Sequence, residues 1–346
     1  MKEYKYLDSE FANDFLSVPT FSSHEIRIIE FIEKWAVENG INIYADKKHN
    51  LYLTKGVLGE NEYYPCFTAH MDSVQEAHLP FIENNEPLPL VYGKVNDKLS
   101  VTCEGFGPGG DDKCGLLIIL TLFKHLPTMK AAFFVEEEIG CLGSNELDES
   151  FFSNVGYVIG YDSPGAGERA AHTCGGSRLF SRNFYETHMK PICDEFGYTK
   201  FFSEPWTDII NICNNTEVEC MNFGSGYYNA HSNYEYIILE DVDNAIALGV
   251  ALATQLGNNK FVFSADCIKE TSFMNTLSGV ESKCKKTKKS KLKETDLEKE
   301  TRILEIVYKN RISNMIEYIT NVCVENDMDA YTLFPELFVN EELSKF

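Results

Sequence analysis

The sequence predicts an α/β fold in which a mostly parallel, mixed sheet carries helices on both of its faces. Two features of the chain favour this fold. Short apolar stretches of strand length alternate with longer apolar or amphipathic stretches of helix length. Charged and imidazole side chains directly follow several of the short stretches, as in sites that form beyond the carboxyl ends of parallel strands.

The helices are expected from their apolar spacing and from residues typical of helix ends. Ile28 and Trp35 fall on one apolar stripe, and Asn39-Gly40 is a typical helix end. Glu240 places a carboxylate in a first helical turn, which suits the helix dipole. The expected helices cover residues 8–16, 25–38, 115–126 and 240–256.

The strands are expected from short runs of apolar and β-branched residues. One run leads directly into His70, and another leads into the three consecutive glutamates that begin at Glu136. A glycine-rich loop is expected at residues 105–110. The expected strands cover residues 41–45, 50–54, 66–69, 101–104, 131–135, 156–160 and 218–223.

Composition narrows the class of protein. The 346 residues are 44% hydrophobic and carry a net charge of -22. Nucleic acid and anionic membranes are excluded as main partners, because both require a basic surface. The eleven cysteines contain no CxxC pair, and the chain shows neither a signal segment nor an apolar run of membrane-spanning length. We therefore expect a cytoplasmic protein.

The composition changes after residue 263. Residues 283–293 contain seven lysines and no acid, which is typical of a solvated linker. Beyond the lysines, the apolar spacing of residues 304–322 favours an amphipathic helix. We expect a catalytic domain at residues 1–263 and a lysine-rich linker with a C-terminal helical appendage at residues 264–346, the helix being a candidate for partner docking or homo-oligomerisation.

Five short polar segments carry the chemistry. Each has an ordinary structural interpretation by itself, such as a hydrogen-bonded histidine, an acidic turn or a solvated charge run. Imidazole and carboxylate are ligands of zinc and similar ions, and five such segments in one chain favour a metal site. Two histidines and three carboxylates can hold two divalent ions if one carboxylate bridges them. The segments are residues 69–72, 110–113, 135–140, 160–162 and 229–232.

The order of these motifs resembles the co-catalytic zinc exopeptidases, a group that contains peptidase T, secreted bacterial leucyl aminopeptidases and the tetrahedral aminopeptidases. The resemblance covers residues 8–258 and begins with the segment 15–20, Glu25, Asp46 and Asn50-Leu51. It implies a zinc-exopeptidase, phosphorylase/hydrolase-like fold. The 69 positions from Asp162 to His231 (231 − 162 = 69) are mostly required by the sheet, so no inserted lid domain is expected.

The resemblance also implies a role for each metal ligand. His70 and Asp162 correspond to the terminal ligands of one ion, and Glu138 and His231 to those of the other. Asp111 corresponds to the bridging carboxylate. The implied ions are two divalent cations, with zinc first and manganese or cobalt as alternatives.

Two further carboxylates receive roles from the resemblance. Asp72 corresponds to the group that orients the first histidine, and Glu137 to the general base. The register of Glu136, Glu137 and Glu138 stays open, because families vary at the first of them. The resemblance further implies a cis peptide between Asp111 and the next residue; the alternative is a trans turn in which that residue caps a helix.

The implied activity is hydrolysis of peptide bonds, foremost as an aminopeptidase that acts on short peptides through a metal-bridging hydroxide. A dipeptidase or an N-acyl-amino-acid deacylase is the alternative, and it requires an arginine for a substrate carboxylate. A catalytically inactive binding protein of the same fold is a second alternative. Candidates near the pocket are Thr207-Asp208, Tyr227 and Tyr228, and the available arginines are Arg169, Arg178 and Arg182.

Overall fold

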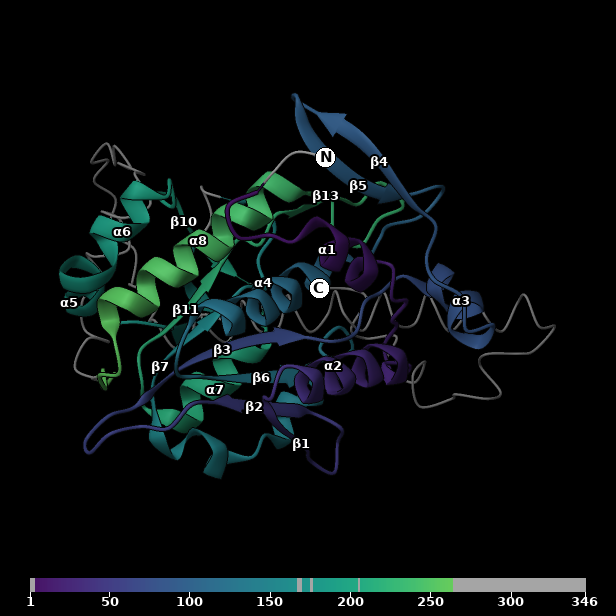
Figure 1. Cartoon of the computed structure of the whole chain (residues 1–346). Helices are drawn as coiled ribbons and strands as arrows, with labels where there is room; N and C mark the ends of the chain where they lie inside the picture. The colour runs from purple at the N-terminus through teal and green to yellow at the C-terminus, as the bar shows by residue number, and fades with distance from the viewer. Residues whose placement is uncertain (1–3, 167–169, 175–176, 205, 264–346) are drawn as a thin grey trace, which may run out of the picture. The chain divides into compact units, whose positions relative to one another are not determined.

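The computed structural model describes residues 4–166, 170–174, 177–204 and 206–263 (Figure 1). The linker and helical appendage expected at residues 264–346 lie outside the described residues. Within the described helices, no segment is both long and apolar enough to cross a bilayer. Seven cysteines of the described part are free and buried, as expected of small core residues.

A mixed sheet with a parallel centre forms the middle of the structure. Its strands are β1 (Asn42–Ala45), β2 (Leu51–Lys55), β3 (Tyr64–His70), β6 (Met129–Phe134), β7 (Val155–Gly160), β8 (Ala170–Cys174), β9 (Ser177–Arg178), β10 (Phe201–Glu204) and β11 (Cys220–Phe223). They are ordered β1-β2-β6-β3-β7-β11-β8-β10, and β9 pairs with β8. The pairs β6-β3, β3-β7 and β7-β11 are parallel, whereas β1-β2, β2-β6 and β11-β8 are antiparallel. The predicted fold class is therefore confirmed.

A second, antiparallel sheet contains the strand expected at residues 101–104. Its order is β12-β13-β5-β4, formed by β12 (Tyr227–Tyr228), β13 (Tyr236–Ile238), β5 (Lys98–Cys103) and β4 (Leu90–Val95). The β4-β5 hairpin extends away from the main sheet in Figure 1. In the sequence, β5 directly precedes the glycine-rich loop, and β12 and β13 flank His231. Because β13 pairs with β5, this sheet connects two of the predicted polar segments.

Helices cover both faces of the main sheet, as predicted. They are α1 (Ser9–Leu16), α2 (Ile26–Glu38), α3 (Leu79–Glu83), α4 (Gly110–His125), α5 (Arg182–Phe184), α6 (Lys190–Glu195), α7 (Asp208–Thr216) and α8 (Leu239–Leu256). At the end of β7, Gly160 faces Ile209 of α7, whereas the hydroxyl of the next residue, Tyr161, donates to the carbonyl of Ala245 in α8. Because consecutive residues point to opposite faces, α7 and α8 lie on opposite sides of the sheet.

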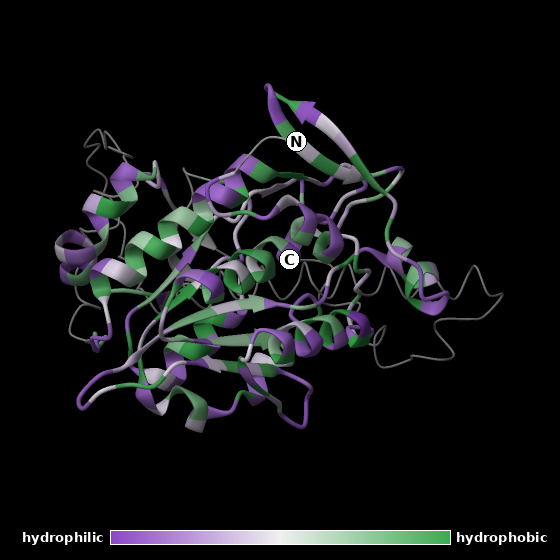
Figure 2. Ribbon diagram, viewed as in Figure 1, coloured by the Kyte–Doolittle hydropathy of each residue, from purple (hydrophilic) through white to green (hydrophobic). Residues whose placement is uncertain are grey.

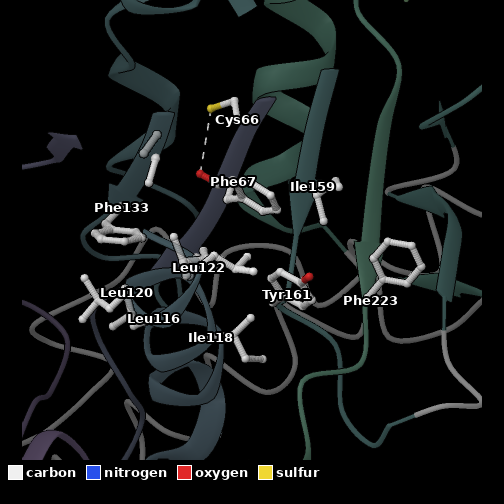
Figure 3. Close-up of a cluster of buried hydrophobic side chains, with 14 of the residues drawn as sticks. Cys66, Phe67, Leu116, Ile118, Leu120, Leu122, Phe133, Ile159, Tyr161 and Phe223 are labelled. Carbon is white, nitrogen blue, oxygen red and sulfur yellow. Dashed lines mark hydrogen bonds between the residues drawn. The ribbon is translucent and has the colours of Figure 1, made fainter. Parts of the chain in front are cut away.

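The core is centred on α4, which packs against β3 and α8. Every residue from Leu116 to Leu122 is at most 1% exposed, so this helix is apolar around its whole circumference, as its sequence predicted. Figure 3 shows the Leu116 side of α4 facing Phe67 and Phe133 of the sheet. Burial of each such side chain contributes roughly 2 kcal/mol, which fixes α4 firmly on the sheet. In Figure 2, hydrophobic residues gather in the central strands and helices, and hydrophilic residues are common in the outer loops.

Candidate metal centre

His70 is the last residue of β3 and is only 1% exposed. Its Nδ1 lies 3.1 Å from the carbonyl oxygen and 3.3 Å from the Oδ1 of Asp72. Its Nε2 therefore points the other way, 3.2 Å from Asp111 Oδ1 and 3.7 Å from Asp162 Oδ1. The imidazole is held on one side so that its second nitrogen faces two carboxylates.

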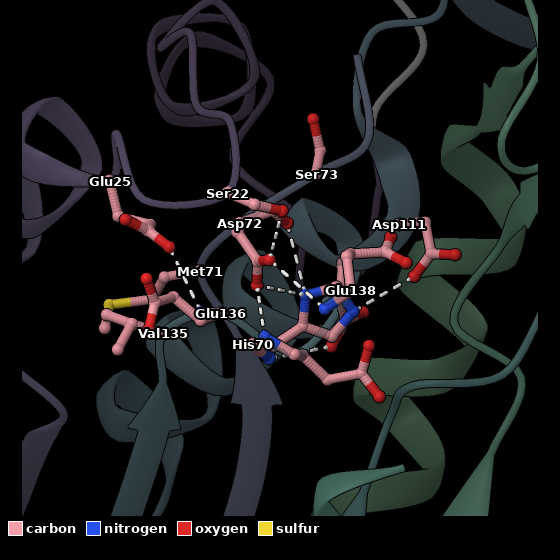
Figure 4. A network of polar contacts seen from close by, with 12 residues as sticks. Ser22, Glu25, His70, Met71, Asp72, Ser73, Asp111, Val135, Glu136 and Glu138 are labelled. Carbon is pink, nitrogen blue, oxygen red and sulfur yellow. Dashed lines mark hydrogen bonds and ion pairs between the residues drawn. The ribbon is translucent and has the colours of Figure 1, made fainter. Parts of the chain in front are cut away.

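Asp72 connects His70 to the loop that carries the glutamates (Figure 4). Besides His70, its carboxylate accepts hydrogen bonds from the Ser22 hydroxyl and from the backbone N–H groups of Glu137 and Glu138. Burial by itself would raise the pKa of Asp72, but the hydrogen bonds from His70 and Ser22 outweigh it and hold the pKa below its usual value. Asp72 is therefore ionised and fixes the imidazole and the loop together.

Asp111 lies at the start of α4, and its two carboxylate oxygens face different histidines. Oδ1 is 3.2 Å from His70 Nε2, and Oδ2 is 3.0 Å from His231 Nε2. The peptide between Asp111 and Asp112 is cis, as the resemblance implied. Asp112 also caps the helix, because its Oδ1 accepts the Gly115 N–H. The capping role and the cis peptide, considered as alternatives from sequence, occur together.

Glu138 and His231 form the outer side of the cluster. Glu138 Oε1 lies 3.0 Å from His231 Nε2, the same nitrogen that faces Asp111. The His231 side chain is 52% exposed, so this side of the cluster is open to solvent. Hydrogen bonds with Asp111 and with Glu138 raise the pKa of His231 to about 10. These carboxylates strongly favour a positive charge at the position of the histidine nitrogen.

Asp162 follows β7 and is held by Asn222 at the end of β11. The Asp162 N–H donates to Asn222 Oδ1, and the Asn222 side-chain amide donates to the Asp162 carbonyl. This pair fixes the backbone of Asp162 so that its Oδ1 faces His70. Asn222 was not singled out from the sequence, although its position at a strand end was a usable signal.

Glu137 lies in the same loop as Glu138 but faces a different environment. Its Oε1 accepts a hydrogen bond from the Cys141 thiol at 3.3 Å. Burial, followed by the nearby charge of Asp162, raises the pKa of Glu137 to about 10. Glu137 therefore lies beside the cluster, and none of its described hydrogen bonds is to a histidine.

The donor set fits divalent cations of the zinc type. Nitrogen and oxygen donors of His70, Asp111 and Glu138 lie within 4.8 Å of one another, and so do those of His70, Asp112 and Asp162. Asp112 is the poorer ligand of the second group, because its oxygens already accept the N–H groups of Gly115 and His70. Contacts of 3.0–3.7 Å join His70, Asp111, Glu138, Asp162 and His231 into one cluster, in which Asp111 contacts both histidines.

Glu235 supports the bridging position, and the sequence analysis missed it. This carboxylate is 1% exposed and accepts the backbone N–H groups of Gly109 and Asp111 at 2.8 and 3.0 Å. It therefore orients the loop that carries Asp111. Its distance of four residues from His231 was the only sequence signal.

The other candidates fall into separate places. Thr207 and Asp208 line a small cavity beside His70 and Asp162. Tyr227 is buried against Gly110. Tyr228 lies elsewhere, because its hydroxyl donates to Asp241 of α8; the prediction that it lies near the pocket is not supported by this contact. Arg178 belongs to β9 and Arg182 to α5, while Arg169 lies outside the described residues.

Comparisons with known proteins give a match only at the level of structure. No protein-family model and no curated protein matches the sequence. The aminopeptidase PepT from Bacillus cereus ATCC 10987 matches with a TM-score of 0.57 at 14% identity, over 71% of this chain and 97% of its own. A TET1 peptidase from Pyrococcus horikoshii matches with a TM-score of 0.55 at 18% identity, over 70% and 98% of the two chains.

A third solved structure agrees with these two. Aminopeptidase APDkam598 from the archaeon Desulfurococcus kamchatkensis matches with a TM-score of 0.54 at 14% identity, over 79% of this chain and 98% of its own. Identities this low establish the fold and leave the activity to be argued from the site. The chain therefore shares its fold with PepT and the TET1 peptidase, as the sequence resemblance implied.

Proposed function

We propose that this chain is a binuclear metallopeptidase that hydrolyses peptide bonds, with zinc-type ions at His70, Asp111, Glu138, Asp162 and His231. One observation carries the proposal: the two oxygens of Asp111 face two different histidines at 3.2 and 3.0 Å. Each of these imidazoles also contacts a second carboxylate, Asp162 at His70 and Glu138 at His231. A single hydrogen bond to Asp111 would not need this set of ligand-type side chains. This arrangement suits a pair of cations that share one ligand.

The chain's own residues supply the proton transfers. Two bound divalent ions would polarise the scissile carbonyl and lower the pKa of a water held between them. Glu137 would accept a proton from the attacking water and pass it to the leaving amine, because bound cations would lower the pKa that burial and Asp162 raise. The Cys141 thiol holds the Glu137 carboxylate, and Asp72 holds the backbone of the same loop.

The charge around the site favours substrates with a free amino group. The described groups closest to the cluster include further carboxylates, Asp208 among them, whose charge acts on His70 and on Glu137. Such surroundings attract the ammonium group of a peptide N-terminus and repel a substrate carboxylate. We therefore assign the chain as an aminopeptidase for short peptides rather than a dipeptidase or a deacylase.

The test is turnover by the full chain with and without a chelator. We expect hydrolysis of amino-acid anilides and free-amine tripeptides, loss of activity in chelator, and recovery when zinc, manganese or cobalt is restored. N-acetylated versions of the same peptides serve as controls and should be poor substrates. Hydrolysis of N-acyl amino acids, with anilides left intact, would instead establish the deacylase. No metal-dependent turnover of any of these substrates would exclude the proposed activity.

We also propose that the chain forms homo-oligomers. The Pyrococcus horikoshii TET1 peptidase, with which it shares its fold, can assemble into a tetrahedron or a large octahedral shell. Light scattering of the full chain measures its mass in solution. A mass of one chain at all concentrations would contradict this proposal without affecting the metal site.

A further inference from the structure

A small cavity lies beside the cluster, at the junction of β3, β7 and the first residue of α7. Its walls include Thr68, Asp162, Asp208 and Asn222. The volume that the centre of a water molecule can occupy in this cavity is about 10 Å³. That space is close to what one water molecule needs, and a potassium ion has nearly the radius of water. The cavity therefore has room for one small guest.

Several buried oxygen atoms of the residues that line this cavity have no hydrogen-bond partner among the described residues. They are Thr68 Oγ1, Asp162 Oδ2 and both side-chain oxygens of Asp208. Thr68 is 2% exposed and Asp208 is 4% exposed. Burial raises the pKa of Asp208 to about 8, whereas the charge of His70 and the nearby Ser144 hydroxyl favour its ionised form. Buried oxygens without partners are costly, since they have left water without replacing it.

Asp162 belongs both to the cluster and to the lining of the cavity. Its Oδ1 faces His70 Nε2 at 3.7 Å, whereas its Oδ2 is buried and lacks a partner in the described part. The cavity therefore adjoins the proposed metal pair, and His70 and Asp162 belong to both. The Asn222 side chain is held in place there, because its Oδ1 and one of its N–H groups pair with the backbone of Asp162.

We propose that Thr68, Asp162 and Asp208 bind a single monovalent cation of about the size of potassium in this cavity. The lining atoms without partners are all oxygens, which are the ligands that hard cations take. One hydroxyl and two carboxylates suit a singly charged ion, because Asp162 also faces the proposed divalent ion. The cation offsets the buried charge of Asp208 and fixes the orientation of Asp162.

This proposal does not depend on peptidase activity. It requires only the three lining residues, and its measurements can be made on a chain that hydrolyses nothing. Two other interpretations make different predictions. A protonated Asp208 would need no cation, and a buried water would not respond to the identity of the salt.

The first measurement is thermal stability of the zinc-loaded full chain in different chloride salts at equal ionic strength. We expect potassium, rubidium and ammonium to raise the melting temperature by about 2–4 °C over tetramethylammonium, which is too large for the cavity. Asp208→Asn and Thr68→Val should lose this difference. Ser225→Ala is the matched control, because the Ser225 hydroxyl is also buried without a partner in the described part but lies outside the cavity.

The second measurement locates the ion. Crystals of the zinc-loaded chain soaked in rubidium chloride should show an anomalous peak between Asp162, Asp208 and Thr68, and Asp208→Asn crystals should lack it. Equal melting temperatures in all salts, with no rubidium peak in the cavity, would overturn the proposal. An Asp208→Asn chain that keeps the full response to potassium would also overturn the proposal. The neutral amide mimics a protonated acid, so the response would then not need the charge of Asp208.

Discussion

Three consecutive glutamates show how strongly function depends on the orientation of single side chains. Glu136 has a positive φ of 55° and accepts a hydrogen bond from the Ser23 hydroxyl, away from the histidines. Glu137 receives the Cys141 thiol, and Glu138 contacts His231. The three side chains thus have different partners, and the register with the base at the second position and the ligand at the third stays a prediction.

The first prediction concerns Glu137. Glu137→Gln should keep its bound metal and lose turnover by a factor of about 100 or more, because the amide cannot accept the proton. Metal content and turnover number are measured on the same preparation. Glu136→Gln is the matched control and should be close to wild type. A Glu137→Gln chain that has lost its metal would mean that the second glutamate is a ligand.

The second prediction concerns Asp72. Asp72→Asn should weaken metal affinity about 10–100-fold, because the amide cannot accept all of the hydrogen bonds that now orient His70 and the glutamate loop. Competition with a fluorescent chelator measures this affinity. Ser22→Ala removes only one of the contacts with Asp72 and should have a much smaller effect. Equal affinities for Asp72→Asn and wild type would show that the histidine is oriented without it.

Among secondary-structure elements, those with strong apolar patterns were predicted well. The helices α1, α2, α4 and α8 and the strands β1, β2, β3, β6 and β7 lie within a few residues of the expected ranges, because burial on the sheet dictates their composition. The β4-β5 hairpin was not fully predicted. Its turn uses Asn96 and Asp97, both at positive φ, without the glycine that usually marks such a turn.

Other parts gave no clear signal. Strands β8 and β10 were not predicted, because they pair with strands that are distant in sequence. The helices α5 and α6 were also missed, because they are too short to show an apolar period. The five candidate ligands follow recognisable strand and loop ends, so their types and order were readable. The positions of Glu235 and Cys141 depend on tertiary contacts, and the sequence alone could not assign them.

The third prediction concerns Glu219, which ties the start of α5 to β11. Its carboxylate accepts the N–H and the hydroxyl of Ser181, and burial raises its pKa from 4.5 to about 7. The folded state therefore binds a proton that the unfolded state has released between about pH 4.5 and 7. Stability should fall across this window as pH rises, by on the order of 2 kcal/mol, and stay flat above it.

Urea unfolding at several pH values tests this link. Glu219→Gln cannot ionise and should show a flatter profile between pH 5 and 7 than the wild-type chain. Glu149→Gln serves as a control at an exposed acid. If Glu219→Gln and wild type lose stability in parallel over this window, another group is responsible.

At the scale of the whole molecule, the last described residues make contacts that the sequence did not reveal. Phe261 accepts the Glu219 N–H and donates to Gly156, and Phe263 donates to Glu217. The Phe261 ring also lies 5.1 Å from that of Phe184. These contacts show that residues 261–263 pack with the described part of the chain, and the domain boundary at residue 263 stays a prediction.

The fourth prediction follows from this boundary. A chain that ends at Phe263 should fold, bind metal and melt close to the full-length chain. A chain that ends at Asn259 loses the backbone and ring contacts of Phe261 and should melt at least about 2–4 °C lower. Calorimetry of both chains makes the comparison. Insolubility of the chain ending at Phe263 would mean that residues 264–346 belong to the core.

The central claim is that two divalent ions share Asp111. Elemental analysis of the full chain, purified without chelator and then equilibrated with zinc or manganese, tests it most directly. The account predicts two ions per chain, with His231→Ala reduced to one ion or fewer. One ion or none in the wild-type chain after loading with either metal would contradict it.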